Sequence, residues 1–147
     1  MMKSFKPLSN HYVQVGAEGY NPFGWKLTWV YSMIKFAYDD IANQFVLDYS
    51  EARNWAGKVW WCFTCDAKIV DTITQMTLYR LYDRASWQMG SWNAKYTGYN
   101  EIEIKTTSTR NYLYVSYWVR IDGEGTFGNA LNQWIPIIIQ LIPQTSG

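Results

Sequence analysis

Two cysteines separated by two residues are the first candidate for chemistry in this sequence. They lie in the stretch VWWCFTCDAKIV, which covers residues 59–70. A thioredoxin-like redox site places such a pair at the start of a helix, because the helix N-terminus lowers the pKa of the first thiol. The flanking residues here are aromatic or β-branched and alternate in polarity, which favours a strand.

A regular strand would keep the two thiols apart. Cys62 and Cys65 would project to opposite faces, with their Cα atoms about 10 Å apart. A disulfide needs a Cα separation below about 7 Å, so the pair could close only around a turn at Phe63 and Thr64. We therefore expect two separate thiols in a strand, with Cys65 on the core side beside Phe63 and Trp61.

Ligands for metals and cofactors are few. A structural zinc site needs four ligands, and the sequence has two cysteines and one histidine, His11. Asp122 and Glu124 supply too few oxygen atoms for a calcium loop, and the glycine-rich stretch around them lacks the Lys and the helix of a phosphate loop. We expect no metal, no cofactor and no catalytic residue.

Paired carboxylates are the second candidate for chemistry. In NEIEIKT, Glu101 and Glu103 share one strand face, about 6.6 Å apart, as a glycosidase acid/base pair could. The stretch resembles the Glu-x-Asp-x-Glu strand of the jelly-roll glucanases, with Glu103 where that motif has Asp and Lys105 where it has a third acid. The missing acid removes one catalytic role, so we rank a hydrolase third, after a structural subunit and a carbohydrate-binding module.

Composition narrows the class of partner. The net charge is +1 and only 17% of residues are charged, which argues against nucleic acid even though TLYRLYDR combines Arg80 and Arg84 with Tyr82. Few charges and 18% aromatic residues are typical of a contact surface. The start of the sequence has no apolar segment of a Sec signal peptide, and no run reaches the ~18 apolar residues of a transmembrane segment.

Period-two alternation dominates the chain and predicts strands. We expect a hairpin over 25–49, β-rich runs over 58–70 and 72–83, a long connection over 84–100, and strands over 101–107, 112–122 and 134–143. EARNWAGK (51–58) interrupts the alternation and is compatible with one helical turn. Seven or eight strands with short turns predict one all-β domain over 1–147, an antiparallel, jelly-roll-like β-sandwich.

The strand NYLYVSYWVRID is the most informative about contacts. Its alternation predicts a core face of Leu113, Val115, Tyr117, Val119 and Ile121. The opposite face carries Tyr112, Tyr114, Trp118 and Arg120, which we interpret as an interaction or ligand face unless another part of the chain covers it.

The last strand is apolar on both faces. In QWIPIIIQLIPQ the apolar residues include Ile135, Ile137, Ile138, Ile139 and Leu141. Such a strand needs partners on both sides, either in the centre of its own sheet or by strand addition to another subunit. At an edge it would be an aggregation hazard.

These observations favour a non-enzymatic, self-associating β-sandwich subunit of a virion (capsid) or a surface filament. Its partners would be other copies of itself or other structural subunits. The alternative is a lectin-like carbohydrate-binding module in which Tyr112, Tyr114 and Trp118 stack on sugar rings. The absence of a Sec signal in the sequence given favours the virion over a secreted filament.

Overall fold

Nine strands make up the regular structure of the described part of the chain. The computed structural model describes residues 8–21, 23–91, 94–106, 113–125, 133–140 and 144–146. The strands in these ranges are β1 (Leu8–Tyr20), β2 (Lys26–Asp39), β3 (Gln44–Lys58), β4 (Asp66–Met76), β5 (Arg80–Ser91), β6 (Ala94–Thr106), β7 (Leu113–Gly125), β8 (Gln133–Gln140) and β9 (Gln144–Ser146).

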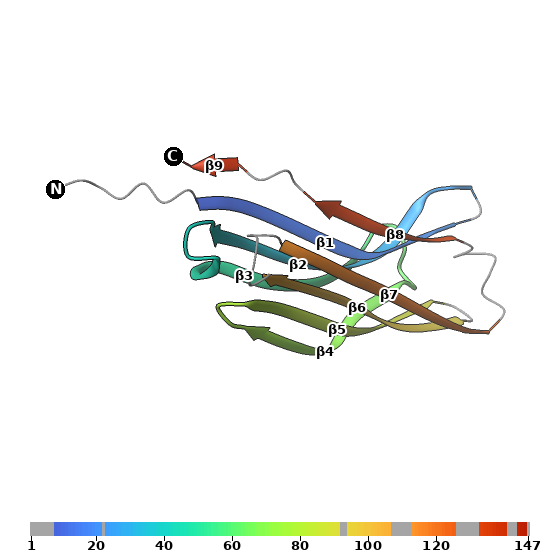
Figure 1. Ribbon diagram of the computed structural model, residues 1–147. Helices are drawn as coiled ribbons and strands as arrows, with labels where there is room; N and C mark the ends of the chain where they lie inside the picture. Colours follow the sequence, from blue (N-terminus) through green and yellow to red (C-terminus); the bar gives the residue numbers. More distant parts are fainter. Residues whose placement is uncertain are drawn as a thin grey trace.

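The strands form two antiparallel sheets that lie one over the other (Figure 1). The first sheet has the order β3-β2-β1-β8, and β9 pairs with the start of β1; the second has the order β4-β5-β6-β7. The predicted antiparallel β-sandwich is confirmed. The likeness to a jelly roll does not extend to topology, because neighbours in each sheet are mostly consecutive in sequence and a jelly roll contains two Greek keys.

Alternation explains why the second sheet forms where it does. On β5, every second residue from 81 to 89 is buried, namely Leu81, Asp83, Ala85, Trp87 and Met89, and the residues that alternate with them are more exposed. In a strand alternate side chains point to opposite faces, so this pattern aligns one apolar face with the first sheet.

The core lies between the sheets and draws on both. The main cluster combines residues of β1, β2 and β3 with residues of β5 and β6: Val13, Val15, Ile34, Phe36, Tyr38, Phe45, Leu81, Ile102 and Ile104. Each of these residues is 1% exposed or less. Burial on this scale holds the two sheets in fixed positions, so their outer faces present rigid surfaces.

The predicted hairpin over 25–49 is confirmed, and its turn is capped by polar groups. The Asp39 side chain accepts hydrogen bonds from the backbone N–H groups of Ile41 (3.0 Å) and Ala42 (3.1 Å). Asn43 adopts φ 55°, the left-handed conformation that Asn tolerates better than most residues.

Several predicted boundaries were wrong. The segment 51–58 continues β3 and contains no helical turn, and the expected connection over 84–100 is the end of β5 and the start of β6. The expected strand over 58–70 is broken at 59–65, where the chain passes from the first sheet to the second. Glycines and polar residues within 84–100 were interpreted as turn signals, but cross-strand pairing accommodates them.

Candidate functional site

The outer face of β7 carries the residues that the sequence nominated for contact. Tyr114 is 62% exposed and Trp118 is 52% exposed, and Arg120 is exposed beside them. We call these three residues the outer strip. Tyr112, the fourth residue nominated, lies outside the described residues.

The opposite face of β7 packs mainly on the core, as predicted. Leu113, Val115 and Val119 pack against the main core cluster, and Ile121 packs against a second one. Tyr117 departs from the prediction because it is 43% exposed. β7 is the last strand of its sheet, and side chains on an edge strand are covered from one side only.

Charged and aromatic groups of β5 and β6 continue the outer strip across the sheet. Trp118 lies opposite Glu101 in the strand register, and Glu101 lies opposite Arg84. The Arg84 guanidinium stacks on the Tyr99 ring at 4.1 Å from its centroid. Arginine planes stacked on aromatic rings are common at contact surfaces, so this part of the sheet is suited to binding.

The two carboxylates that were candidates for acid/base chemistry do share this face. Arg80 Nε donates a hydrogen bond to Glu103 Oε2 (2.7 Å), and Arg80 Nη2 lies 2.6 Å from the same oxygen in an ion pair. Lys105 Nζ lies 3.3 Å from Glu103 Oε1. Burial acts to raise the pKa of Glu103, but the hydrogen bonds and charges of Arg80 and Lys105 outweigh it and lower that pKa. A carboxylate held in its ionised form is a poor proton donor, so this geometry favours an ion-pair role.

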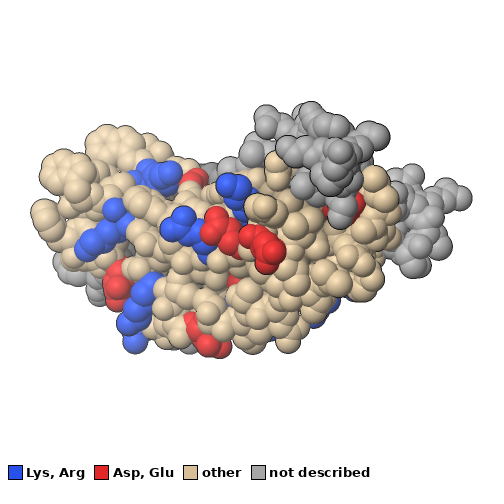
Figure 2. Space-filling model, turned by 90° about the vertical axis from the view of Figure 1, so that its left-hand side faces the viewer, with Lys and Arg blue, Asp and Glu red and all other residues tan. Residues whose placement is uncertain are grey.

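A shallow depression lies at the outer strip, next to Tyr114. Its volume is about 190 Å³, and it is lined by Glu103, Lys105, Tyr114 and Ser116. On the face shown in Figure 2, positive and negative side chains are interspersed on a mostly uncharged surface. No single sign of charge dominates that face.

The strand nominated for pairing between subunits is β8. It pairs with β1 of its own chain, with Ile135 opposite Glu18, Ile137 opposite Gly16, and Ile138 opposite Val15. Ile139 lies opposite Gln14, and Leu141 lies outside the described residues. Among the described strands β8 ends the order of its sheet, so pairing of its other edge with a second copy stays a prediction.

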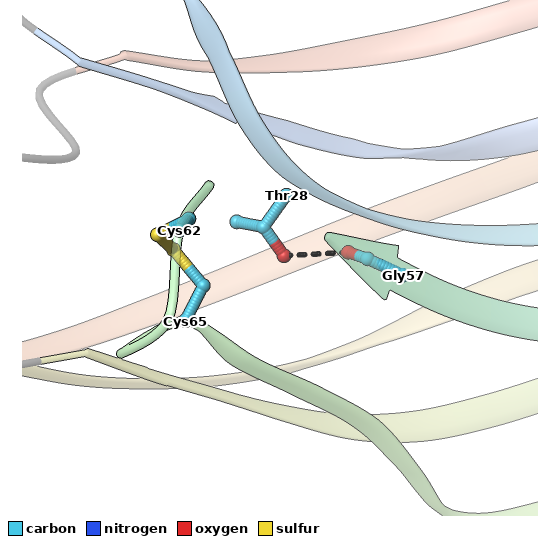
Figure 3. Close-up of a disulfide and its surroundings, with 4 residues drawn as sticks. All are labelled: Thr28, Gly57, Cys62 and Cys65. Carbon is cyan, nitrogen blue, oxygen red and sulfur yellow. Dashed lines mark hydrogen bonds between the residues drawn. A yellow bond between two sulfur atoms is a disulfide. The ribbon is translucent and has the colours of Figure 1, made fainter. Parts of the chain in front are cut away.

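The cysteines correct the sequence interpretation most clearly. Cys62 and Cys65 form a disulfide with a Cα–Cα distance of 5.5 Å. The chain turns at 63–64, so the 10 Å spacing of an extended strand does not apply. Figure 3 shows the bridge within the connection from β3 to β4, close to Thr28 of β2, whose hydroxyl donates to the Gly57 carbonyl (2.8 Å). Both cysteines are buried.

Around this disulfide lies a group of exposed aromatic residues that sequence analysis missed. We call it the aromatic tip; its members are Phe23 (81% exposed), Trp25 (62%), Trp60 (84%), Trp61 (36%) and Phe63 (82%). The β1–β2 turn and the β3–β4 connection contribute them, and the ring centroids of Trp25 and Trp61 are 6.0 Å apart, edge to face. The expected core positions of Trp61 and Phe63 were therefore wrong.

A signal for this arrangement was present in the sequence. Residues 59–63 are apolar throughout, whereas the strands around them alternate. Two cysteines three residues apart can also form a disulfide when a turn separates them. Both features together point to a connection that exposes apolar side chains.

Three carboxyl groups are buried in the described part of the chain, those of Glu18, Asp39 and Asp83, and Asp83 is the most deeply buried of them. Asp83 is fully buried and accepts hydrogen bonds from Thr74 Oγ1 (2.8 Å) and Asn54 Nδ2 (3.2 Å). Among the described residues, its Oδ2 atom has no hydrogen-bond partner. Burial raises the pKa of this carboxyl, and the two hydrogen bonds only partly oppose that effect. Because it is sealed between the sheets, Asp83 bears on stability and is closed to a substrate.

Comparisons with known proteins do not assign this chain to a family. No family model, curated protein or solved structure matches the chain. Within the described part of the chain, no three His, Cys, Asp or Glu side chains gather as a metal ion would require. The same part contains no helix that is long and apolar enough to cross a membrane. The molecule is thus an antiparallel β-sandwich with an outer strip on β7 and an aromatic tip at one end.

Proposed function

We propose that this protein is a non-enzymatic structural subunit that self-associates, of the kind that builds a virion capsid or a surface filament. The observation that carries the proposal is the outer strip, where Tyr114, Trp118 and Arg120 stand exposed on a rigid sheet. Tyr, Trp and Arg are the residue types most enriched among the residues that dominate binding at protein interfaces.

The position of β8 adds a second means of association. Its sequence, QWIPIIIQ, has only two polar residues, and among the described strands it ends its sheet. Apolar edge strands are hazards unless another element covers them or another chain pairs with them. Strand addition from a second copy would satisfy the free backbone groups of that edge.

Self-association can be tested by multi-angle light scattering over a concentration series, with the outer strip removed in a second sample. We expect the wild-type mass to rise with concentration in the micromolar range. Tyr114→Ala/Trp118→Ala should weaken association at least about tenfold, because truncating a central aromatic anchor often costs 2 kcal/mol or more.

Tyr49→Ala is the matched control. Tyr49 is 71% exposed on β3, in the other sheet, so its removal should leave association unchanged. A wild-type protein that stays monomeric at about 100 μM would contradict the proposal. So would equal effects of the two sets of variants.

A carbohydrate-binding module is the second candidate. The observation that favours it is the depression beside Tyr114, which combines an exposed ring with the polar groups of Glu103, Lys105 and Ser116. A sugar could stack on the ring while its hydroxyl groups bond to those side chains. A glycan array that shows no binding of the wild-type protein would contradict this candidate. Binding that is seen for the wild type and lost in Tyr114→Ala would favour the carbohydrate-binding module over self-association.

A further inference from the structure

The aromatic tip gathers five exposed aromatic side chains at one end of the sandwich. Single exposed apolar residues are common, but contiguous apolar patches mark contact sites. Phe23, Trp60 and Phe63 each expose more than four fifths of their surface. The tip belongs to two connections between strands, so it is separate from the outer strip on β7.

Hydrogen bonds and packing hold the backbone of both connections in place, so the exposed rings belong to an ordered part of the structure. The Asn21 side chain accepts hydrogen bonds from the backbone N–H groups of Phe23 and Trp25, both at 2.9 Å. The Val59 N–H donates a hydrogen bond to the Leu27 carbonyl (2.9 Å), which joins the β3–β4 connection to the start of β2. Beneath the rings, the disulfide packs against Leu27, Val59 and Tyr96 in a buried cluster.

Charge is arranged in a definite order around the tip. The described residues of the two connections, 23–25 and 59–65, contain no charged side chain. Lys26, Lys58 and Asp66 flank them directly; Lys58 and Asp66 are exposed, and Lys26 is held by Glu18 at 3.2 Å. Farther back, exposed Lys68 and Lys95 line a depression that Asp66 also lines. Among these residues, four lysines and two acids therefore lie behind an uncharged aromatic end.

We propose that the aromatic tip inserts into the interfacial region of an anionic lipid bilayer. Trp is enriched at the level of the lipid headgroups, where its ring is apolar and its N–H can meet water. Lysines close behind would meet the negative headgroups, each adding about fivefold to the affinity near the surface. This order of aromatic end and basic flank matches the change in polarity across a bilayer surface.

The disulfide gives the insertion its rigidity. It closes the turn that carries Phe63, and Trp60 and Trp61 directly precede that turn in the sequence. Rings that are already held in place lose less conformational freedom on binding. The tip can therefore insert without unfolding the sandwich.

Co-sedimentation of the oxidised, full-length chain with lipid vesicles tests the proposal. Vesicles of phosphatidylcholine with about 30% phosphatidylglycerol should retain the protein, and vesicles of phosphatidylcholine alone should retain it less. Brominated acyl chains should quench tryptophan fluorescence. Trp60→Ala/Phe63→Ala should lower the partition coefficient at least about tenfold, because both exposed rings would be lost from the apolar region.

Tyr114→Ala/Trp118→Ala is the matched control, since it removes two exposed aromatic residues from the outer strip. It should keep vesicle binding, whereas Trp60→Ala/Phe63→Ala should keep self-association, so the two proposals fail independently. The bilayer proposal is overturned if neither vesicle retains the wild type, or if the tip variant binds vesicles as well as the wild type does. Loss of self-association in the tip variant without a loss of vesicle binding would overturn it in favour of a contact between copies.

Discussion

The outer strip and the aromatic tip are both exposed and aromatic, yet they arise in opposite ways. The outer strip lies on a regular strand, and its exposed residues alternate with core residues of β7. The tip lies on two connections, where apolar residues follow one another without alternation. One surface is fixed by strand register, and the other by a disulfide and local hydrogen bonds.

This difference explains which surface the sequence could reveal. In a strand, one set of alternate residues must be buried, so the other set is assigned to the outside by elimination. In a connection that rule does not hold, and an apolar residue can be exposed or buried. The same residue types therefore carry reliable positional information on β7 and little between β3 and β4.

Two glycines provide the strongest test of this contrast. Gly98 on β6 lies beside β7, opposite Ile121 in the strand register, and an added Cβ would lie 2.0 Å from the Arg120 carbonyl oxygen and 2.5 Å from the Trp87 ring. Gly98→Ala should lower the free energy of unfolding by about 3 kcal/mol, because the β6–β7 ladder would have to shift. Urea unfolding followed by circular dichroism measures this change.

Gly24 in the tip is the control. It adopts φ 82° and has no other atom within 4 Å of an added Cβ. Gly24→Ala should cost only about 1 kcal/mol, the penalty of a left-handed backbone. Equal losses in the two variants would show that the close approach of β7 and Trp87 is not what restricts Gly98.

The fold class was predictable because the burial pattern is strong. Ile102 and Ile104 alternate with Glu101 and Glu103, and the structure buries the first pair completely while leaving the second outside. The meander order was beyond prediction, because pairing between strands depends on long-range contacts that period-two patterns do not encode.

The aromatic tip was missed for a related physical reason. Cys62 and Cys65 were assigned to an extended strand on the aromatic and β-branched character of their neighbours. A disulfide is a tertiary constraint, and here it stabilises a turn that local propensity does not favour. Phe63 consequently moves from an expected core position to the outside.

Loss of the disulfide should affect the aromatic tip and leave the outer strip unchanged. A bridge that closes so short a loop is worth about 2 kcal/mol by chain entropy. Cys62→Ala/Cys65→Ala should therefore lower the stability of the sandwich by no more than that amount. Retention on anionic vesicles should fall several-fold, because the tip would lose its fixed shape, while self-association through the outer strip should persist.

Reduced wild-type protein is the companion measurement for that variant. A mild reductant should reproduce the loss of vesicle retention and have no further effect on the double variant. If reduction leaves retention unchanged while a thiol assay shows the bridge to be open, the disulfide does not shape the tip.

The smallest expected effect concerns the core that both surfaces share. Burial raises the pKa of Asp83, so the folded state binds this proton more tightly than the unfolded state does. Stability from this group is therefore greatest below the unfolded pKa, near 4, and decreases as pH rises through the folded pKa. The stability contributed by Glu103 depends on pH in the opposite direction. Its pKa is lowered in the folded state, so this contribution is lost as pH falls.

Asp83→Asn isolates the buried group from the other carboxyls. It replaces a buried, partly unsatisfied carboxyl with a neutral group of the same size, so the variant should be more stable than the wild type at pH 7, by about 1 kcal/mol. The advantage should shrink at pH 4, where the wild-type carboxyl gains its proton. Urea midpoints at the two pH values measure the difference, and a constant offset would contradict a raised pKa. Because the two surfaces share this core, vesicle retention and self-association should disappear at the same urea concentration, and that concentration should rise in the variant at pH 7.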